Sequence, residues 1–286
     1  MNPFRIEHLT HYHYSGPVME SFAELRLAPL ATPHQKLKQR ILTIYPETRV
    51  TSYLDHYGNQ VEFFSLASRH EEMKILSQCE VEIANQPYHS EPLPIQSIQP
   101  FYQSLAQDYF DFLAPTPLVP LGKPFERFIS KWFPVSQPLG EALFDFTRFI
   151  NKQFNYQSGA TTVETNAAQI AKTKQGVCQD FAHFMLAVLR TAQIPARYVS
   201  GYIESANSSA NQPELVGAEA SHAWVEVLMP DQTWRGYDPT NGIFTENRHI
   251  VLAVGRDYSD VPPFRGTYQG SQSLNLTVQV NVKRIN

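Results

Sequence analysis

Residues 176–195 read GVCQDFAHFMLAVLRTAQIP and hold one of only two cysteines in the 286-residue chain. Apolar side chains in this stretch recur at the spacing of an amphipathic helix, at Phe181, Met185, Val188, Leu189 and Ala192. The helix is predicted to begin near Cys178, directly after Gly176, and to end before Pro195. Free N–H groups and partial positive charge at a helix start activate a thiol. Cys178 is therefore either a buried apolar residue or a nucleophile.

The bulk composition is that of a globular protein. Hydrophobic residues make up 42% of the chain and charged residues 17%, with a net charge of −4, so no attraction to nucleic acid or to an anionic membrane is expected. Residues 1–16 contain no apolar signal-peptide core, and residues 112–122 are too short and proline-rich to span a bilayer. Because two cysteines do not form a disulfide framework, we expect a cytoplasmic protein with reduced thiols.

The first third of the chain has the pattern of strands. Short runs bounded by turn residues predict a β-rich, sandwich-like N-terminal domain over residues 1–95. Residues 57–59 (Tyr-Gly-Asn) are expected to form a turn, and proline-rich residues 86–100 indicate a linker. One face of the first strand is expected to hold alternate residues: Ile6, His8, Thr10, Tyr12 and Tyr14.

The remainder mixes helical and strand patterns, so the overall class is α+β. A core domain is expected over residues 96–270, with helices at 124–133 and 140–154 before the cysteine helix. Residues 271–286 alternate between apolar and polar side chains, which predicts a C-terminal strand.

A thiol nucleophile needs a base and a group that orients the base. His222 begins one strand-like run, 221–229, and Asp238 lies in the next, 233–241. A turn at residues 230–231 between these runs places His222 directly opposite Asp238, with Cβ atoms about 4.5–5.5 Å apart on one face. We therefore expect Asp238 to bind one imidazole nitrogen while the other faces Cys178.

These segments resemble a known family. The runs GVCQDFAHFMLAVLRTAQIPARYVSGY, SHAWVEV and WRGYDPTNG are similar to the bacterial transglutaminase-like family of the papain-like cysteine enzyme superfamily. HIVLAVGRDYSDVPPFRG resembles the continuation of that core. YSGPVMESFAELRLAP and LDHYGNQVEFF resemble the β-rich domain that precedes it in many bacterial members.

The resemblance implies a papain-like core with Cys178 on a helix as nucleophile, and with His222 as acid/base and Asp238 as orienting partner on antiparallel strands. It implies an acyl-enzyme formed from a peptide, a protein or another amide. Hydrolysis, as in a cysteine protease, is the first expectation. Transamidation and an inactive peptide-binding scaffold are the alternatives. No cofactor and no metal is expected, because the acidic runs of calcium-dependent animal transglutaminases are missing from the sequence.

Four further assignments are less specific. An oxyanion hole is expected to use the Cys178 backbone N–H together with either Tyr156 or Gln179. Trp224 shares a strand face with His222, so it either shields the imidazole from water or packs in the core. Residues 205–219 are expected to line a specificity pocket. Structural roles are expected for three other polar residues and one ion pair: Asp180, His183, Cys79 and the pair Arg256–Asp257.

Overall fold

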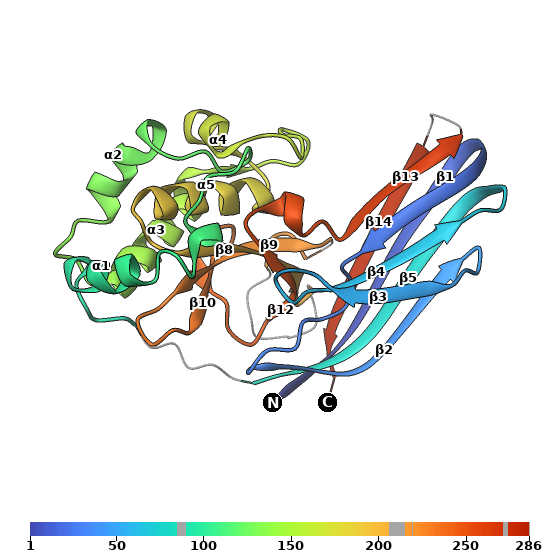
Figure 1. The fold of residues 1–286 in the computed structure, drawn as a ribbon, viewed down its shortest axis with the longest axis horizontal. Helices are drawn as coiled ribbons and strands as arrows, with labels where there is room; N and C mark the ends of the chain where they lie inside the picture. The colour runs from blue at the N-terminus through green and yellow to red at the C-terminus, as the bar shows by residue number, and fades with distance from the viewer. Residues whose placement is uncertain (85–89, 206–214, 219, 271–273, 286) are drawn as a thin grey trace.

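The computed structural model describes residues 1–84, 90–205, 215–218, 220–270 and 274–285. These residues form three layers: a group of helices, a five-stranded sheet in the middle and a seven-stranded sheet on the far side (Figure 1). The predicted α+β class, with a β-rich N-terminal part, is confirmed. None of the helices in this part of the chain has the length and apolar content that a bilayer requires.

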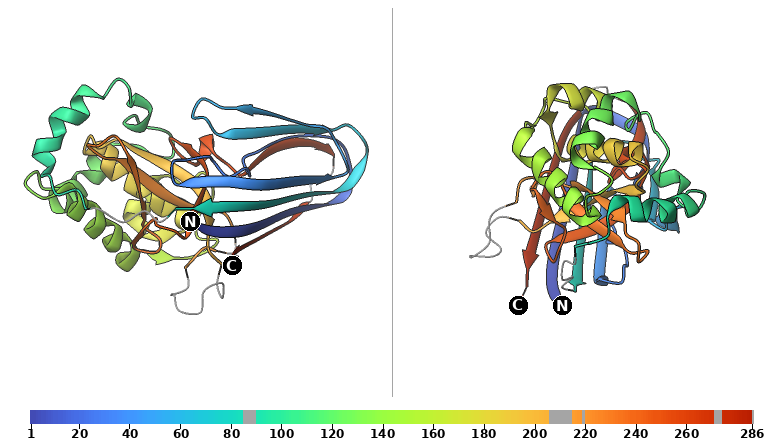
Figure 2. Two further views of the ribbon diagram at one scale, coloured as in Figure 1. Left: turned by 90° about the horizontal axis from the view of Figure 1, so that it is seen from below. Right: turned by 90° about the vertical axis from the view of Figure 1, so that its left-hand side faces the viewer.

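The seven-stranded sheet contains both ends of the chain. Its strands are β1 (Asn2–Leu25), β2 (Gln35–Tyr45), β3 (Val50–Leu54), β4 (Gln60–Leu66), β5 (His70–Ile83), β13 (Phe264–Gly270) and β14 (Leu274–Arg284). The order is β2-β5-β1-β4-β3, and β13 and β14 pair with the opposite side of β1. The register on β1 shifts between His13 and Val18, and the long strands curve (Figure 2).

The expected face of β1 is confirmed, because all five predicted residues are buried. The predicted turn is also confirmed: residues 55–59 connect β3 to β4, and Gly58 has a φ of +79° that few other residues adopt easily. The predicted linker at 86–100 is wrong at its C-terminal end, since a helix begins at Ile95 and includes Pro100.

The core supplies the other two layers. Its helices are α1 (Ile95–Ser104), α2 (Lys123–Trp132), α3 (Leu139–Gln153), α4 (Ala167–Thr173) and α5 (Cys178–Thr191), with short η1 (Phe110–Phe112) and η2 (Tyr258–Asp260). Its strands are β6 (Asn155–Tyr156), β7 (Gln175–Gly176), β8 (Ala196–Ile203), β9 (His222–Leu228), β10 (Trp234–Asp238), β11 (Ile243–Phe244) and β12 (His249–Gly255). The middle sheet has the order β11-β10-β9-β8-β12.

Helix α5 is buried on almost every side, so its predicted amphipathic character is wrong. The sheet covers one face through Ala223, Val225 and Val227, while α2, α3 and α4 pack around the rest. Phe184 in α5 contacts the rings of Phe128 and other aromatic residues of these helices. A helix enclosed in this way holds its first residue, Cys178, in a fixed position between the helices and the sheet.

The two sheets are joined by apolar packing and by two side-chain amides. Phe4, Ile6 and Cys79 pack with residues of β8 and β12, which gives Cys79 the core role that its sequence predicts. The Asn59 amide both donates to the Val254 carbonyl and accepts from its N–H, each at 2.8 Å. Gln35 pairs in the same way with a second β12 residue. The amides thus satisfy the backbone of edge strand β12.

The substitution Asn59→Asp tests this junction. Aspartate has nearly the same shape but cannot donate to the Val254 carbonyl, and it would be a buried charge 3.0 Å from Asp55. We expect the free energy of unfolding in urea to fall by about 3 kcal/mol or more. Gln103→Glu, the same chemical change at an exposed site, should alter it by less than about 0.5 kcal/mol. Equal stability of the two variants would show that the amide does not hold β12.

Candidate active site

Cys178 is the first residue of α5, as predicted, and it is only 9% exposed. Asp180 fixes the turn that leads into the helix, because its Oδ2 accepts from the Val177 backbone N–H at 2.8 Å and from the Thr161 hydroxyl at 2.6 Å. Only glycine fits at position 176, because the Cβ of any other residue would lie 2.5 Å from that same oxygen of Asp180. Asp180 therefore has the structural role that was predicted, and it fixes the backbone beside Cys178.

His222 and Asp238 meet, but not in the register that the sequence predicts. The turn at residues 230–231 was expected to set them directly opposite, whereas the observed pairing of β9 with β10 places Asp238 level with Trp224. Met229 pairs with Thr233, so residues 230–232 form the turn and Gln232 has a φ of +61°, whereas the expected pairing would set Met229 level with Asp231. A shift of two positions keeps both side chains on one face. Nε2 of His222 therefore still reaches Oδ2 of Asp238, at 2.9 Å, along the diagonal.

The Asp238 carboxylate is fully buried and accepts five hydrogen bonds. Oδ1 accepts from the backbone N–H groups of Thr240 at 2.9 Å and Asn241 at 3.1 Å. Oδ2 accepts from the Asn241 side chain at 2.8 Å, from His222 and from His249. A buried carboxylate without such donors would be strongly disfavoured, so this set of donors keeps Asp238 ionised inside the protein.

The pair also shifts the pKa of both partners. Burial opposes charge on His222, but the Asp238 carboxylate outweighs burial and raises the imidazole pKa to about 10, with a smaller contribution from Cys178. Burial likewise opposes ionisation of Asp238, yet the two imidazoles hold its pKa well below its usual range. At neutral pH the arrangement therefore favours an imidazolium beside a carboxylate.

The second imidazole nitrogen of His222, Nδ1, is the one left for Cys178. Besides Asp238, Cys178 is the group whose hydrogen bonding and charge raise the pKa of the ring. Gly217, with φ +91°, passes beside this atom: a Cβ there would lie 2.8 Å from Nδ1 and 3.7 Å from the Tyr156 hydroxyl. The geometry leaves Nδ1 free to exchange a proton with the thiol.

Comparison with known proteins identifies the family of the chain. The model of the transglutaminase-like superfamily matches residues 133–239, and that of the bacterial transglutaminase-like N-terminal region matches residues 4–82. An uncharacterized protein of Mycobacterium tuberculosis is 34% identical over 293 aligned residues, which cover 98% of this chain and 92% of that protein. The chain belongs to the transglutaminase-like superfamily.

Two other relatives of this transglutaminase-like chain are informative. A solved structure from Cytophaga hutchinsonii, described provisionally as a cysteine protease, superimposes with a TM-score of 0.76 at 21% identity, over 100% of this chain and 91% of that one, and so shares its fold. The protein-glutamine gamma-glutamyltransferase of Pseudomonas aeruginosa is 35% identical over 136 residues, which are 43% of this chain and 20% of that protein.

His249 joins the transglutaminase-like site although the sequence did not predict it. Its Nε2 lies 3.1 Å from Oδ2 of Asp238, the oxygen that also binds His222. Burial lowers the pKa of His249, although Asp238 opposes this, so His249 donates as a neutral imidazole. Trp224 is fully buried, with its ring 5.2 Å from that of His249 and 6.2 Å from that of His222. The tryptophan thus packs behind both rings.

The two histidines and Asp238 have the residue types of a zinc site, and their candidate ligand atoms lie within 4.8 Å of one another. Nε2 of each ring and Oδ2 of the carboxylate are, however, already joined by hydrogen bonds. A metal ion bound to these atoms would replace the contact that orients His222. In its present form the group is suited to holding a proton.

The structure treats the two candidate oxyanion donors differently. Tyr156 is 36% exposed and lies beside Gly217, at the edge of the site. The Gln179 amide is directed to the Val163 carbonyl at 3.4 Å. Of the two side chains, Tyr156 is therefore the one placed beside Gly217 and the His222 ring.

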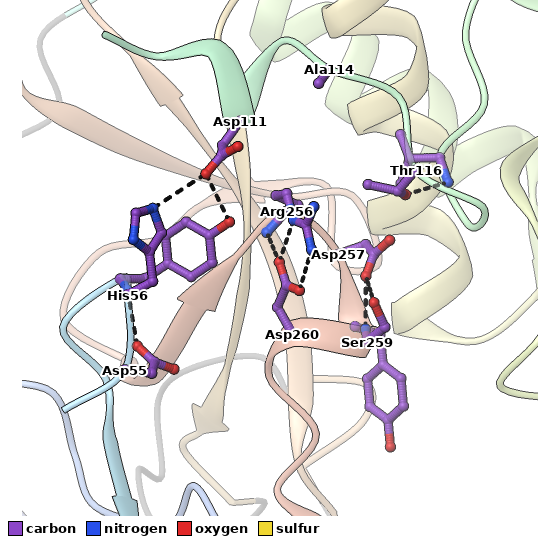
Figure 3. Close-up of polar contacts among 12 residues, drawn as sticks. Asp55, His56, Asp111, Ala114, Thr116, Arg256, Asp257, Ser259 and Asp260 are labelled. Atoms are coloured by element: carbon purple, nitrogen blue, oxygen red, sulfur yellow. Dashed lines mark hydrogen bonds and ion pairs between the residues drawn. The ribbon is translucent and has the colours of Figure 1, made fainter. Parts of the chain in front are cut away.

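Two polar groups near α5 lie outside the Cys178, His222 and Asp238 group. His183 is buried and its Nε2 accepts from the Tyr258 backbone N–H at 3.1 Å; burial lowers its pKa to about 4, as suits the predicted structural role. The predicted ion pair Arg256–Asp257 is wrong, because Arg256 binds Asp260 through two hydrogen bonds of 2.9 Å (Figure 3). The short η2 helix turns the chain so that Asp260, four positions on, reaches the guanidinium.

The predicted specificity loop, residues 205–219, lies largely outside the described residues, which exclude 206–214 and 219. Its described end is tied to the site through Asn241. The Asn241 side chain accepts from the Val216 backbone N–H and donates to Asp238, each at 2.8 Å. One side chain thus connects the loop to the carboxylate that orients His222.

Replacing Asp238 by asparagine removes the charge that holds the proton on His222. Burial should then dominate, so we expect the His222 pKa to fall from about 10 to below its ordinary 6.5. Because Asp238 raises the His222 pKa, the ion pair stabilises the folded protein fully below about pH 6.5, and this stabilisation is lost as the pH rises towards 10. The loss of stability caused by Asp238→Asn should therefore become smaller as the pH rises. NMR titration of labelled histidine rings measures the shift; an unchanged His222 titration would contradict the ion pair.

Paired substitutions at His249 separate its hydrogen bond from its packing. His249→Phe keeps a ring of similar size but removes the donor to Asp238, and His249→Gln keeps an amide donor at about the position of Nε2. We expect the phenylalanine variant to lower the rate of Cys178 alkylation about tenfold and to move the His222 pKa by about half a unit, and glutamine to restore most of both. If the two variants had the same alkylation rate and the same His222 pKa, His249 would contribute only through packing and not through its hydrogen bond to Asp238.

Proposed function

We propose that this transglutaminase-like chain is a cysteine-dependent amide hydrolase that acts on peptide or isopeptide bonds. Cys178 is the nucleophile, His222 the acid and base, and Asp238 the residue that orients the imidazole. The observation that supports this best is the buried His222–Asp238 contact of 2.9 Å, with the free imidazole nitrogen left to Cys178 at the start of α5. The substrate is a peptide, a protein or another amide.

The proposed reaction has two halves. In the resting pair the proton of the Cys178 thiol is already on Nδ1 of the His222 imidazolium, so the sulfur attacks the carbonyl carbon as a thiolate; the C–N bond then breaks as the imidazolium gives that proton to the leaving amine. Water attacks the resulting thioester while His222 accepts a proton, and the C–S bond breaks to release the acid and the thiol. The backbone N–H of Cys178 and the Tyr156 hydroxyl are the proposed oxyanion donors. This chemistry needs no cofactor.

Transamidation is the second candidate, because the relative from Pseudomonas aeruginosa bears the name of a protein-glutamine gamma-glutamyltransferase. It would use the same thioester and replace water with a primary amine. An inactive peptide-binding scaffold has less support, since the three side chains of the triad are all present. We also propose a reducing, cytoplasmic location, because both described cysteines are free and the mechanism needs a reduced thiol.

Thiol reactivity tests the nucleophile independently of any substrate. Cys79 is an internal reference, because it is buried in the sheet and burial raises its pKa. With iodoacetamide at pH 7, we expect Cys178 to be alkylated at least about tenfold faster than Cys79, and Asp238→Asn to remove most of that difference. Mass spectrometry of tryptic peptides measures both rates in one sample. Equal rates for the two cysteines in the unmodified protein would contradict the proposed nucleophile.

A glutamine-containing peptide library, assayed with and without a primary amine, separates hydrolysis from transfer. We expect cleavage or ammonia release without amine incorporation, and no reaction with Cys178→Ala. Incorporation of the amine as the main product would favour the transferase instead. Turnover that survives Cys178→Ala would overturn both acyl-enzyme proposals.

A further inference from the structure

The helical layer carries a charge opposite to that of the whole chain. Residues 123–174 contain seven lysines and arginines against four acidic residues, a net charge of +3, although the chain as a whole has −4. The rest of the sequence therefore has a net charge of −7. Such a separation of charge concentrates an attraction for anions on one side of the molecule.

Six of these seven cations gather around two adjoining depressions on α2, α3 and α4. We call this surface the basic groove; its cations are Arg127, Lys131, Arg148, Lys152, Lys172 and Lys174. Both depressions share Lys131, Trp132, Phe149 and Gln153, so they form one continuous surface. Asp145 is the acidic residue among the lining side chains.

The cations of the basic groove are not neutralised within the part of the chain that the structure describes, where none of the six belongs to an ion pair. Arg127 donates to the Ala171 carbonyl at 3.1 Å, which leaves its charge unbalanced. Unpaired cations at this density repel one another, and an anionic ligand would relieve the repulsion.

The aromatic residues of the groove are covered by cations. Lys131 Nζ lies 4.9 Å from the centre of the Trp132 ring and 5.7 Å from that of Phe149. The Trp132 and Phe149 rings also contact each other, with centres 4.8 Å apart. A nucleobase binds best to an uncovered ring on which it can stack. Rings occupied in this way, with the Lys131 ammonium group beside both, favour separate carboxylates over nucleic acid.

Two short strands connect the basic groove to the catalytic residues. Lys174, in the groove, precedes β7 and then Cys178, which is four residues or about 13 Å further along extended chain. Gln153, also in the groove, precedes β6 and Tyr156. The strands pair with each other, with Asn155 donating to the Lys174 carbonyl at 2.8 Å. A polypeptide held at Cys178 would therefore reach the groove within about four residues.

We propose that the basic groove is an extended substrate site that binds a carboxylate-rich polypeptide segment next to the amide that Cys178 attacks. This inference rests on the proposed function, and it names the substrate class: an amide whose neighbouring residues are acidic. Charge complementarity supplies the attraction, and the short β6–β7 connection sets the distance between the acidic residues and the reacting carbonyl.

Binding is best measured on full-length Cys178→Ala protein, which cannot turn over the ligand. The probe is fluorescein-labelled hexaglutamate, followed by fluorescence anisotropy at 50 and 300 mM salt. We expect the double variant Lys131→Glu/Lys152→Glu to bind about tenfold more weakly, and the matched variant Lys36→Glu/Lys283→Glu, on the seven-stranded sheet, to bind within twofold of the parent. High salt should weaken binding to the parent. Lys131→Gln/Lys152→Gln provides a milder variant if charge reversal prevents folding.

The controls separate the two proposals from each other. Equal binding of hexaglutamate by the groove and control variants, or equal binding of hexaglutamine and hexaglutamate by the parent, would overturn the acidic-segment site. Tighter binding of an oligothymidylate of equal charge would overturn the assignment to carboxylates. If groove-dependent binding occurs but the unmodified protein hydrolyses neither acidic nor neutral peptides, the groove stands as a docking site for acidic polypeptide and the hydrolase proposal fails.

Discussion

The structure depends on keeping one carboxylate ionised inside the protein. Asp238 has no exposed surface, so each of its oxygens must be satisfied by donors from the chain. Those donors come from β9, from the turn after β10 and from β12, three separate segments between residues 222 and 255. The charge can be buried only when all three segments are in place, which links the state of the His222–Asp238 pair to the state of the middle sheet.

This dependence gives the β-rich part of the chain a role in holding the His222–Asp238 pair. β12 is an edge strand of the middle sheet, and it brings His249 to Asp238. The side-chain amides of Asn59 and Gln35, from the other sheet, pair with its backbone as a neighbouring strand would. The N-terminal sheet therefore supports the His222–Asp238 pair indirectly, through β12 and then His249.

The sequence predicts those parts of the site that depend on local pattern. The helix start at Cys178 follows from apolar spacing, and His222 and Asp238 share a face because side chains in strands alternate. Their register could not be predicted, since it depends on a three-residue turn, 230–232, in which Gln232 adopts a left-handed conformation. His249 was missed for a different reason: its strand pairs with β8, so no spacing rule relates it to Asp238. Net charge concealed the basic groove because an average over the chain hides a local excess.

The pairing of β1 with β14 has a consequence for how the chain acquires its fold. Phe4 is level with Arg284, so the seven-stranded sheet closes a loop of about 280 residues that contains the entire core. Contacts of such high sequence separation are slow to form, because the entropy of the intervening chain opposes them. During synthesis, one side of β1 remains an unpaired strand edge until β13 and β14 have left the ribosome. The growing chain is therefore sensitive to aggregation at that strand. A chaperone that shields β1 would therefore raise the yield of folded protein without altering its final stability.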